Sequence, residues 1–153
     1  MSIEISNIAP LASLFEESIE QVCTRELSAI KYLLQRVDRR VVLVGAGTLG
    51  RRARSLLVKL GAKLMSFTDN NSQAWGTEIE NLPVLSPTEA ASRYGNSALF
   101  LVTIWNDRHR FRETYDQLTG LGCSTVSSYL PLFWRFPNDF LQLILLNELP
   151  HKL

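Results

Sequence analysis

The sequence predicts an α/β fold with an open, mainly parallel sheet of about five strands and helices on both faces. Three observations predict it. The apolar residues 41–44, three of them β-branched, indicate a strand that is buried on both faces. Glycines follow at G-x-G-x-x-G spacing and lead into a helical pattern that stops at Gly61. Strand-like and helix-like stretches then alternate as far as residue 128, so the fold class is Rossmann-like.

The three glycines of the turn, Gly45, Gly47 and Gly50, each have a physical reason. The first permits the tight turn out of the strand, the second lets a pyrophosphate approach the backbone, and the third lets the helix pack closely on the strand. The amino terminus of the following helix offers N–H groups and a partial positive charge to an anion. The turn therefore predicts nucleotide binding. The structural alternative is a glycine turn that only shapes an α/β domain.

An acidic residue ends the second predicted strand. That strand spans residues 63–68, and Asp69 follows it, nineteen positions after Gly50. This is close to the spacing at which a carboxylate accepts hydrogen bonds from a ribose. Because no basic residue directly follows Asp69, a 2′-hydroxyl is favoured over a 2′-phosphate, and NAD or a sugar nucleotide over NADP. Arg51 or Arg52 is a candidate phosphate contact, and the alternative is that both are simply solvated.

The flanking segments complete the predicted order of elements. Residues 10–36 carry apolar side chains at steps of three and four, which predicts one amphipathic helix, or two joined near residues 23–26. This segment is expected to cover one face of the sheet, or to form a dimer contact. Further strands are predicted at 82–85, 98–104 and 124–128, and further helices from 87 to near 95 and from about 108 to 118. Ser86 is expected to cap the first of these two helices and Asp107 the second.

Ligands of such sheets bind past the carboxyl ends of the strands. That edge gathers the candidate cofactor-binding residues, which are Gly45, Ala46, Gly47, Thr48, Leu49, Gly50, Asp69, Asn70, Thr103 and Trp105.

The last stretch of the chain is dense in large apolar residues. Four of them are predicted to pack on the sheet as a short helix: Phe140, Leu141, Ile144 and Leu145. Four others are less easily buried by a domain of this size and predict an interface, hence a homo-oligomer: Leu132, Phe133, Trp134 and Phe136. The chain is thus divided into a helical segment (1–38), a nucleotide-binding domain (39–129) and an apolar tail (130–153).

Bulk composition narrows the classes of partner. A net charge of +1 predicts no recruitment of nucleic acid or of an acidic membrane surface. Two cysteines a hundred positions apart form neither a disulfide framework nor a metal-binding spacing, which fits a reducing cytoplasm. No signal peptide and no run of about eighteen apolar residues is present, so no membrane span is expected.

The sequence contains no legible catalytic apparatus. The two histidines, His109 and His151, belong to no triad or metal site. Tyr115 is followed by Thr119 at the spacing where a short-chain dehydrogenase has a lysine. Cys123 is a conceivable nucleophile, but a single cysteine near the start of a strand is more often part of the core.

Several stretches together resemble the amino-terminal region of FkbM-family methyltransferases, in which a Rossmann-like domain precedes the methyltransferase domain. They are GAGTLGRRARSLL, FTDNNSQAWGTEIENLPVLSPTEAASRYG, ALFLVTIWN, SYLPLFWRFP and NELPHKL, within residues 40–153. The FTDNN and LPVLSPTEA elements also resemble nucleotide-sugar-associated Rossmann domains, such as those of sugar acyltransferases. The chain stops where a methyltransferase domain is expected to begin. The resemblance therefore implies a cofactor-binding module, with Gly45, Gly47, Gly50 and Asp69 as candidate nucleotide contacts and no methyl-transfer residue.

S-adenosylmethionine is the less expected ligand of this domain. In domains that bind S-adenosylmethionine, the glycine turn usually reads G-x-G-x-G, with an acid two positions before it. In this chain Leu49 stands in place of the third glycine and Leu43 in place of the acid. We expect a module that binds NAD or a sugar nucleotide and is accessory to an FkbM-type methyltransferase chain or domain. The alternatives are an interaction module with a vestigial site, or a minimal NAD-dependent enzyme acting on sugar nucleotides.

Overall fold

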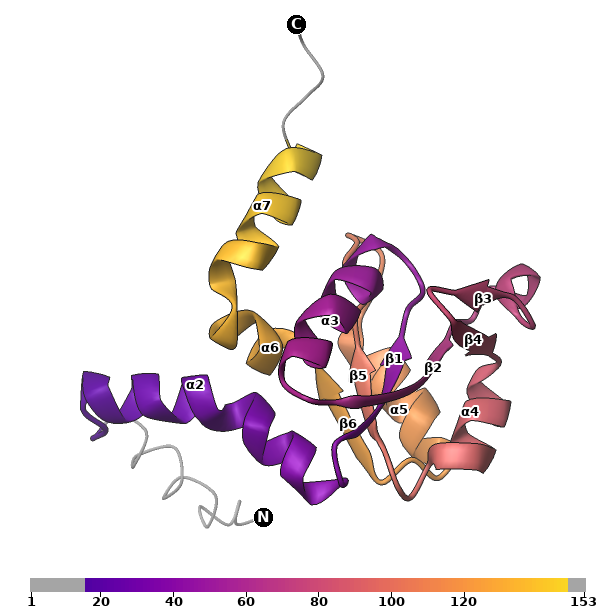
Figure 1. Cartoon of the computed structure of the whole chain (residues 1–153), viewed down its shortest axis with the longest axis horizontal. Coiled ribbons are helices and arrows are strands. Elements are labelled where there is room, and N and C mark those ends of the chain that lie inside the picture. Colours follow the sequence, from indigo (N-terminus) through magenta and orange to yellow (C-terminus); the bar gives the residue numbers. More distant parts are fainter. Residues whose placement is uncertain (1–15, 149–153) are drawn as a thin grey trace, which may run out of the picture.

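A computed structural model describes residues 16–148, and the side chains up to residue 142. Six strands form one sheet in the order β3-β4-β2-β1-β5-β6 (Figure 1), and all neighbours are parallel except β3 and β4. The strands are β1 (Arg40–Val44), β2 (Lys63–Thr68), β3 (Glu78–Ile79), β4 (Leu82–Leu85), β5 (Leu99–Val102) and β6 (Thr125–Ser128). The predicted Rossmann-like α/β fold is therefore confirmed.

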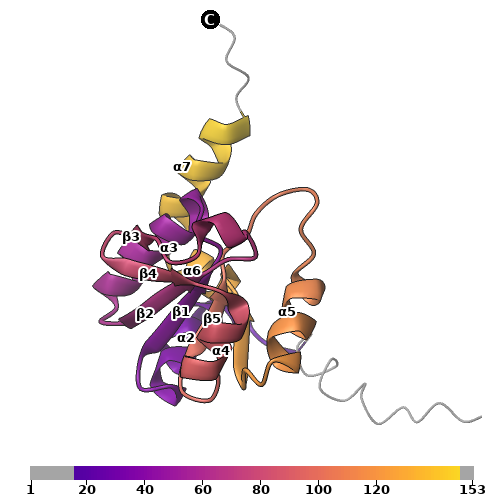
Figure 2. The same ribbon diagram turned by 90° about the vertical axis from the view of Figure 1, so that its right-hand side faces the viewer.

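Helices cover both faces of this sheet (Figures 1 and 2). They are α2 (Ile19–Arg36), α3 (Thr48–Lys59), α4 (Pro87–Tyr94), α5 (Phe111–Gly120), α6 (Leu130–Arg135) and α7 (Pro137–Glu148), with a short 3-10 turn, η2 (Ser72–Ala74). Helices α2, α3, α6 and α7 contribute to the apolar cluster on one face, and α4 and α5 to the cluster on the other. No helix in residues 16–148 is long and apolar enough to cross a bilayer.

Strand β1 lies at the centre and shows why its sequence is apolar throughout. Val41 and Leu43 belong to the cluster under α2 and α3, whereas Val42 and Val44 belong to the cluster under α4 and α5. A strand covered on both faces has no solvent side, so the usual apolar–polar alternation is absent.

One strand was not predicted. β3 pairs antiparallel with β4 through a two-residue turn at Glu80 and Asn81, whose φ angles are 50° and 66°. Two positive φ angles in a two-residue hairpin define a type I′ turn, for which the usual signal is Asn-Gly. Glu-Asn lacks that glycine and β3 has only two residues, so the sequence gives little signal for this strand.

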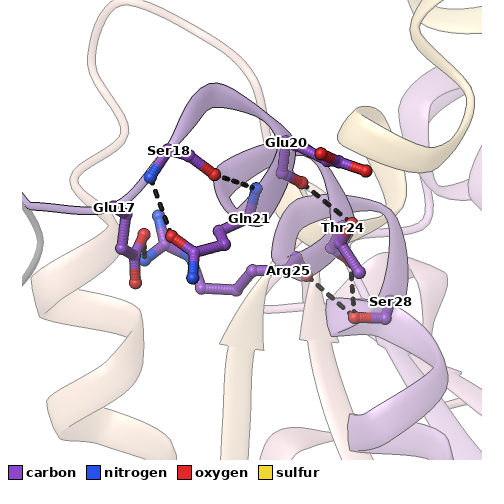
Figure 3. Close-up of polar contacts among 7 residues, drawn as sticks. All are labelled: Glu17, Ser18, Glu20, Gln21, Thr24, Arg25 and Ser28. Atoms are coloured by element: carbon purple, nitrogen blue, oxygen red, sulfur yellow. Dashed lines mark hydrogen bonds and ion pairs between the residues drawn. The ribbon is translucent and has the colours of Figure 1, made fainter.

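Helix α2 is one continuous helix and does not break near residues 23–26. Its first turn is closed by a capping box, in which Ser18 Oγ accepts from the Gln21 N–H (3.2 Å) and Gln21 Oε1 accepts from the Ser18 N–H (2.8 Å; Figure 3). Only its second half packs on the domain, since Ile30 is fully buried and Ile19 is 85% exposed. The predicted helical residues before position 16 lie outside the described part of the chain.

The predicted start of α5 was wrong. Asp107 does not cap this helix, which begins at Phe111 after Arg110. Asn106 instead accepts a hydrogen bond from the Arg108 N–H at 3.0 Å and closes a turn of its own. The loop after β5 is therefore longer than predicted. The start of α4 was predicted correctly, with Ser86 Oγ accepting from the Glu89 N–H at 3.1 Å.

Part of the apolar tail is more deeply buried than predicted, whereas Leu141, which was predicted to pack on the sheet, is 42% exposed. Leu132 is fully buried, because α6 lies against α2 and inserts this side chain into the cluster shared with α3. Phe140 of α7 is also fully buried and stacks near Tyr129, with ring centroids 5.8 Å apart. Phe133 and Phe136 are partly buried against the same cluster, and Trp134 remains exposed. The side chains of Ile144 and Leu145 lie outside the description. The boundaries after residues 38 and 129 stay predictions.

Candidate functional site

The order of the strands locates the candidate site. From β1 the chain proceeds to β2 and β4 on one side, and then returns to β5 on the other side of β1. The carboxyl ends of β1 and β5 therefore meet at a topological switch point, where open α/β sheets bind their ligands. The glycine turn follows β1, and Thr103 follows β5. Two of the sequence-predicted segments are thus neighbours at this point.

Gly45 is fixed by its backbone and its neighbours. Its φ of +106° lies where side chains are strongly disfavoured, and an added Cβ would come within 2.8 Å of Ile104 Cγ1 and 3.1 Å of the Thr103 carbonyl oxygen. Its N–H donates to the Thr68 carbonyl at 2.8 Å. The Thr103 hydroxyl lies 3.0 Å from the Val44 carbonyl oxygen and 3.2 Å from that of Gly45. Thr103 is therefore a positioning residue that holds the turn.

Gly47 and Gly50 have opposite surroundings. A Cβ on Gly50 would lie 2.1 Å from the Gly45 carbonyl oxygen, so the start of α3 packs directly on the turn. A Cβ on Gly47 would meet nothing within 4 Å. Gly47 is the N-cap of α3, and no side chain caps the helix there. The N–H groups of Thr48 and Leu49, at the start of α3, have no hydrogen-bond partner among the described residues.

Asp69 supports the glycine turn directly. Its Oδ2 accepts from the Ala46 N–H at 3.0 Å and its Oδ1 accepts from the Asn71 N–H at 2.8 Å. The Trp75 indole N–H donates to the Asp69 carbonyl at 2.7 Å. Each carboxylate oxygen can accept a second bond, so a hydroxyl of a ligand can still bind. Sequence spacing predicted only contact with a ribose, because the bond to Ala46 depends on how β1 and β2 are paired.

A small slot lies beside Asp69. It has a volume of about 60 Å³. The carboxyl ends of β1 and β2 line it with Gly45 and Asn70, which follow them, and so do Pro87 of α4, Ile104 beyond β5, and Gln117 of α5. The side-chain amides of Asn70 and Gln117 form a reciprocal pair, with N···O distances of 3.3 and 2.9 Å. The slot is about the size of two waters. Gln117 was not singled out in the sequence, because a lone glutamine on a helix gives no signal.

Trp105 lies apart from the glycine turn. It is 62% exposed and lines a cavity of about 460 Å³ between the ends of β5 and β6 and the start of α5. Phe111 and Tyr129 are the other aromatic residues of this cavity. The rings of Trp105 and Tyr129 meet edge to face, with centroids 6.2 Å apart. Ile104 lines both this cavity and the small slot, so it separates the two. Phe111 and Tyr129 could not be assigned from sequence, since aromatic residues usually form core.

The candidate residues thus fall into three groups. The turn residues Gly45 to Gly50 lie next to Asp69, and Asn70 lies next to Gln117. Leu49 is only 8% exposed and belongs to the core cluster, so its side chain is not available to a ligand. Trp105 belongs to the larger cavity.

The arginines of α3 serve mostly structural contacts. Arg52 pairs with Asp139 of α7, with Nη2 3.1 Å from Oδ1, so it ties α7 to the start of α3. Arg54 pairs with Glu80 in the β3–β4 turn at 2.8 Å. Arg51 is in none of the ion pairs of the described residues and lies in the first turn of α3. Of the two candidate phosphate contacts, Arg51 therefore has its charge available.

The described residues contain no group of three or more His, Cys, Asp or Glu side chains that is arranged to hold a metal ion. Cys123 is buried, and the loss of solvation raises the pKa of its thiol to about 11. A thiol with this pKa is protonated at neutral pH and is a poor nucleophile. His109 Nε2 lies 2.8 Å from Thr114 Oγ1, and this contact joins the segment before α5 to the start of that helix.

Comparison with known proteins finds similarity to solved structures only. No protein-family model matches the chain, and no curated protein is similar to it in sequence. The crystal structure of RSP, a Rex-family repressor, matches 66% of this chain and 51% of its own length, at 20% identity and a TM-score of 0.46. The match to RSP in complex with beta-NADH covers 79% of this chain and 71% of the RSP chain, at 19% identity and a TM-score of 0.45. At this level the likeness concerns the fold. The resemblance to FkbM-family proteins has no counterpart among these matches.

The expectation of no nucleic-acid partner is corrected by a third match. RSP in complex with beta-NAD+ and operator DNA matches 81% of this chain and 69% of its own length, at 19% identity and a TM-score of 0.45. The exclusion rested on a net charge of +1, which sums over the whole chain and does not describe local clusters of charge. Net charge is therefore no ground for excluding nucleic acid here.

Proposed function

We propose that this chain is a nucleotide-binding module whose ligand is NAD. The observation that carries the proposal is the open space at Gly47. The two flanking glycines of the motif are packed against backbone, whereas Gly47 faces solvent at the uncapped amino terminus of α3. A helix end of this kind, with unpartnered N–H groups and no side chain in the way, is suited to a pyrophosphate.

The residues present fit the rest of such a ligand. Asp69 has acceptor capacity left for a ribose hydroxyl, and its negative charge disfavours a 2′-phosphate. The slot beside Asn70 adjoins the same ribose position, but a nucleobase needs more room than about 60 Å³. The Asn70–Gln117 pair is therefore expected to separate when the base enters.

The cavity at Trp105 is proposed to take the other half of the ligand. Its volume of about 460 Å³ lies in the range of small-molecule sites, and its aromatic walls suit a flat ring. NAD, when bound, supplies hydride transfer. The contribution of this chain is to bind and orient, through the N–H groups at Gly47, the Asp69 carboxylate and the aromatic side chains.

Two finer assignments stay predictions. A sugar nucleotide uses the same pyrophosphate and ribose contacts, and it is the competing ligand in the experiment below. The accessory role beside an FkbM-type methyltransferase rests on the sequence resemblance alone.

The test is a titration of purified protein with NAD, NADH, NADP, a uridine-diphosphate sugar and S-adenosylmethionine, followed by calorimetry and thermal unfolding. NAD or NADH is expected to bind, and to stabilise the fold by about 2.7 kcal/mol at a hundred times the dissociation constant. Gly47→Val is expected to abolish this binding and to cost at most about 1 kcal/mol of stability, as for a less favourable N-cap.

Gly120→Val is the matched control. Gly120 also has nothing within 4 Å of an added Cβ, but it lies in the last turn of α5, away from the turn at Gly47. This variant is expected to bind as the wild type does. The proposal fails if no nucleotide binds, or if Gly47→Val binds as tightly as Gly120→Val. Stronger binding of the sugar nucleotide would replace NAD as the ligand.

A further inference from the structure

A second cavity lies at the opposite end of α3. It has a volume of about 570 Å³ and is enclosed by α2, the last residue of α3, the turn before β1 and the end of α6. Helix α3 has twelve residues, so this cavity and the Gly47 site lie about 18 Å apart along its axis. The cavity has no residue in common with the Gly47 site or with the Trp105 cavity.

The floor of this cavity is apolar. Ile30 and Leu34 of α2 line it and are almost fully buried. Their side chains offer almost no surface to a ligand. The accessible apolar surface comes from Leu27, which is 47% exposed, and from Leu60, which is partly buried. An apolar wall that remains open to solvent in the isolated chain favours a ligand with an apolar body.

The rim of the cavity is cationic. Lys31, Arg39, Lys59 and Arg135 line it, and no carboxylate does. Six ion pairs are found within the described residues, and none of them includes any of these four side chains. None of the four side chains therefore forms an ion pair among the described residues. Asp38, whose pKa is lowered chiefly by Lys63 and to a smaller extent by Arg39, is paired with Lys63.

Helix ends explain only part of this charge. Three helices, α2, α3 and α6, end at the cavity, and the carboxyl end of each carries roughly half a negative charge. Lys59 and Arg135 lie in the last turns of α3 and α6, where a cation complements the dipole, whereas Lys31 lies before the last turn of α2 and Arg39 lies beyond the end of that helix. Complementing the helix ends therefore accounts for two of the four cations and leaves Lys31 and Arg39.

The turn that carries Arg39 has an unusual backbone. Asp38 and Arg39 have φ angles of 49° and 61°, a region that favours glycine, and the Arg39 N–H donates to the Leu34 carbonyl at 2.7 Å. A helix terminated in this way normally has glycine in the first of these positions. The presence of a guanidinium at such a position fits a role for its charge, since backbone geometry alone would favour a smaller residue.

From this combination we propose that the cavity binds an amphipathic carboxylate, with an unbranched alkyl chain against Leu27 and Leu60 and the carboxylate among Lys31, Arg39, Lys59 and Arg135. The alkyl chain supplies affinity through burial, and the four cations select the sign of the charge. This site is independent of the proposed nucleotide site.

The test is a titration of the full chain with decanoate below its critical micelle concentration, followed by calorimetry and by amide NMR shifts. Binding is expected to shift the amides of Ile30, Leu34 and Leu60 while that of Gly47 is unchanged. Octanoate is expected to bind several-fold more weakly, because each buried methylene contributes about a fourfold gain at most. Decyltrimethylammonium, with the same chain and the opposite charge, is expected not to bind.

Variants localise the carboxylate. Lys31→Gln and Lys59→Gln are each expected to weaken decanoate binding by about two- to fivefold, as for an exposed charge contact. Arg112→Gln removes one positive charge from α5, on the other face of the sheet, and is the matched control. Thermal unfolding of all three variants checks that the fold is kept.

Three outcomes would overturn the proposal. The first is no binding of decanoate, or binding whose shifts fall at Gly47 or Trp105. The second is equal binding of decanoate and decyltrimethylammonium, which would mean that the cations do not select the ligand. The third is a short single-stranded oligonucleotide that shifts the amides of Ile30 and Leu34 where decanoate does not, which would assign the four cations to a phosphate backbone.

Discussion

The two ends of helix α3 offer anions two different environments. At the amino end, Gly47 presents backbone N–H groups in open space, and the helix dipole itself favours negative charge. At the carboxyl end, the dipole opposes an anion, and Lys59 with three other cations outweighs it. At the amino end an anion can approach because Gly47 has no side chain. At the carboxyl end an anion is attracted by four cationic side chains. Changes that add or remove side chains should therefore affect the two ends differently.

The largest effect is expected at the packed glycine of the amino end. Gly50→Ala places a Cβ 2.1 Å from the Gly45 carbonyl oxygen, a backbone atom that cannot turn away. The start of α3 must then move off the turn, and we expect a loss of about 3 kcal/mol or more in the free energy of unfolding. Urea denaturation measures this loss. Gly47→Ala is the comparison, and an equal loss in both variants would contradict the distinction between a packed and an open glycine.

The next effect is expected at the residue that supports the turn from the side. Asp69→Ala removes the acceptor for the Ala46 and Asn71 N–H groups, and should cost about 1–2 kcal/mol because the site is partly exposed. Nucleotide binding should weaken by at least about tenfold, while decanoate binding is unchanged. Calorimetry with both ligands measures the difference. A variant that binds the nucleotide normally would show that Asp69 supports neither the turn nor the ribose.

Alkaline pH should lower the free energy of unfolding through Cys123, a core residue that belongs to neither end of α3. The pKa of Cys123 is raised to about 11 in the folded protein, from an ordinary value near 9. Between these values the unfolded chain binds fewer protons than the folded one, so stability falls as pH rises from 9 to 11, by about 1–2 kcal/mol. Thermal unfolding across this range measures the slope. In Cys123→Ala the slope should be smaller, and an unchanged slope would assign it to other groups.

Raising the salt concentration should weaken ligand binding to different extents at the two ends of α3, because the positive charge has a different source at each end. The cations of the carboxyl end are exposed side chains, so raising the salt concentration from 50 to 500 mM should weaken decanoate binding by about three- to tenfold. Nucleotide binding at Gly47 should weaken less, because short hydrogen bonds from backbone N–H groups are less screened. Titrations at both salt concentrations compare them. The reverse order of sensitivity would count against the comparison.

The smallest effect is expected in the β3–β4 turn, which lies outside both ends. Asn81→Gly suits the φ of 66° at this position and should stabilise the protein by about 0.5 kcal/mol. Neither ligand should bind differently, so the variant provides a baseline for the others. A loss of stability would mean that the Asn81 side chain has a role that its exposed position does not indicate.

The sequence by itself determined β1, β2, the glycine turn and the start of α4, because each depends on neighbours within a few positions. A run of apolar residues, a spacing of glycines and a Ser-Pro pair with Glu89 carry their own physical reasons. The same local signals predicted Asp69 as a candidate site residue. They did not reveal that its carboxylate accepts from Ala46, since that bond needs β1 and β2 side by side.

Tertiary structure alone decided what distant segments do together. Leu132 was expected at an interface and is fully buried, because α6 lies against α2, about a hundred positions earlier in the chain. Only the folded chain brings Arg135 to Lys31 and Lys59, and only there does the space at Gly47 differ from that at Gly50. Periodicity and spacing report neighbours along the chain. Burial, cavities and the pairing of charges depend on neighbours in space.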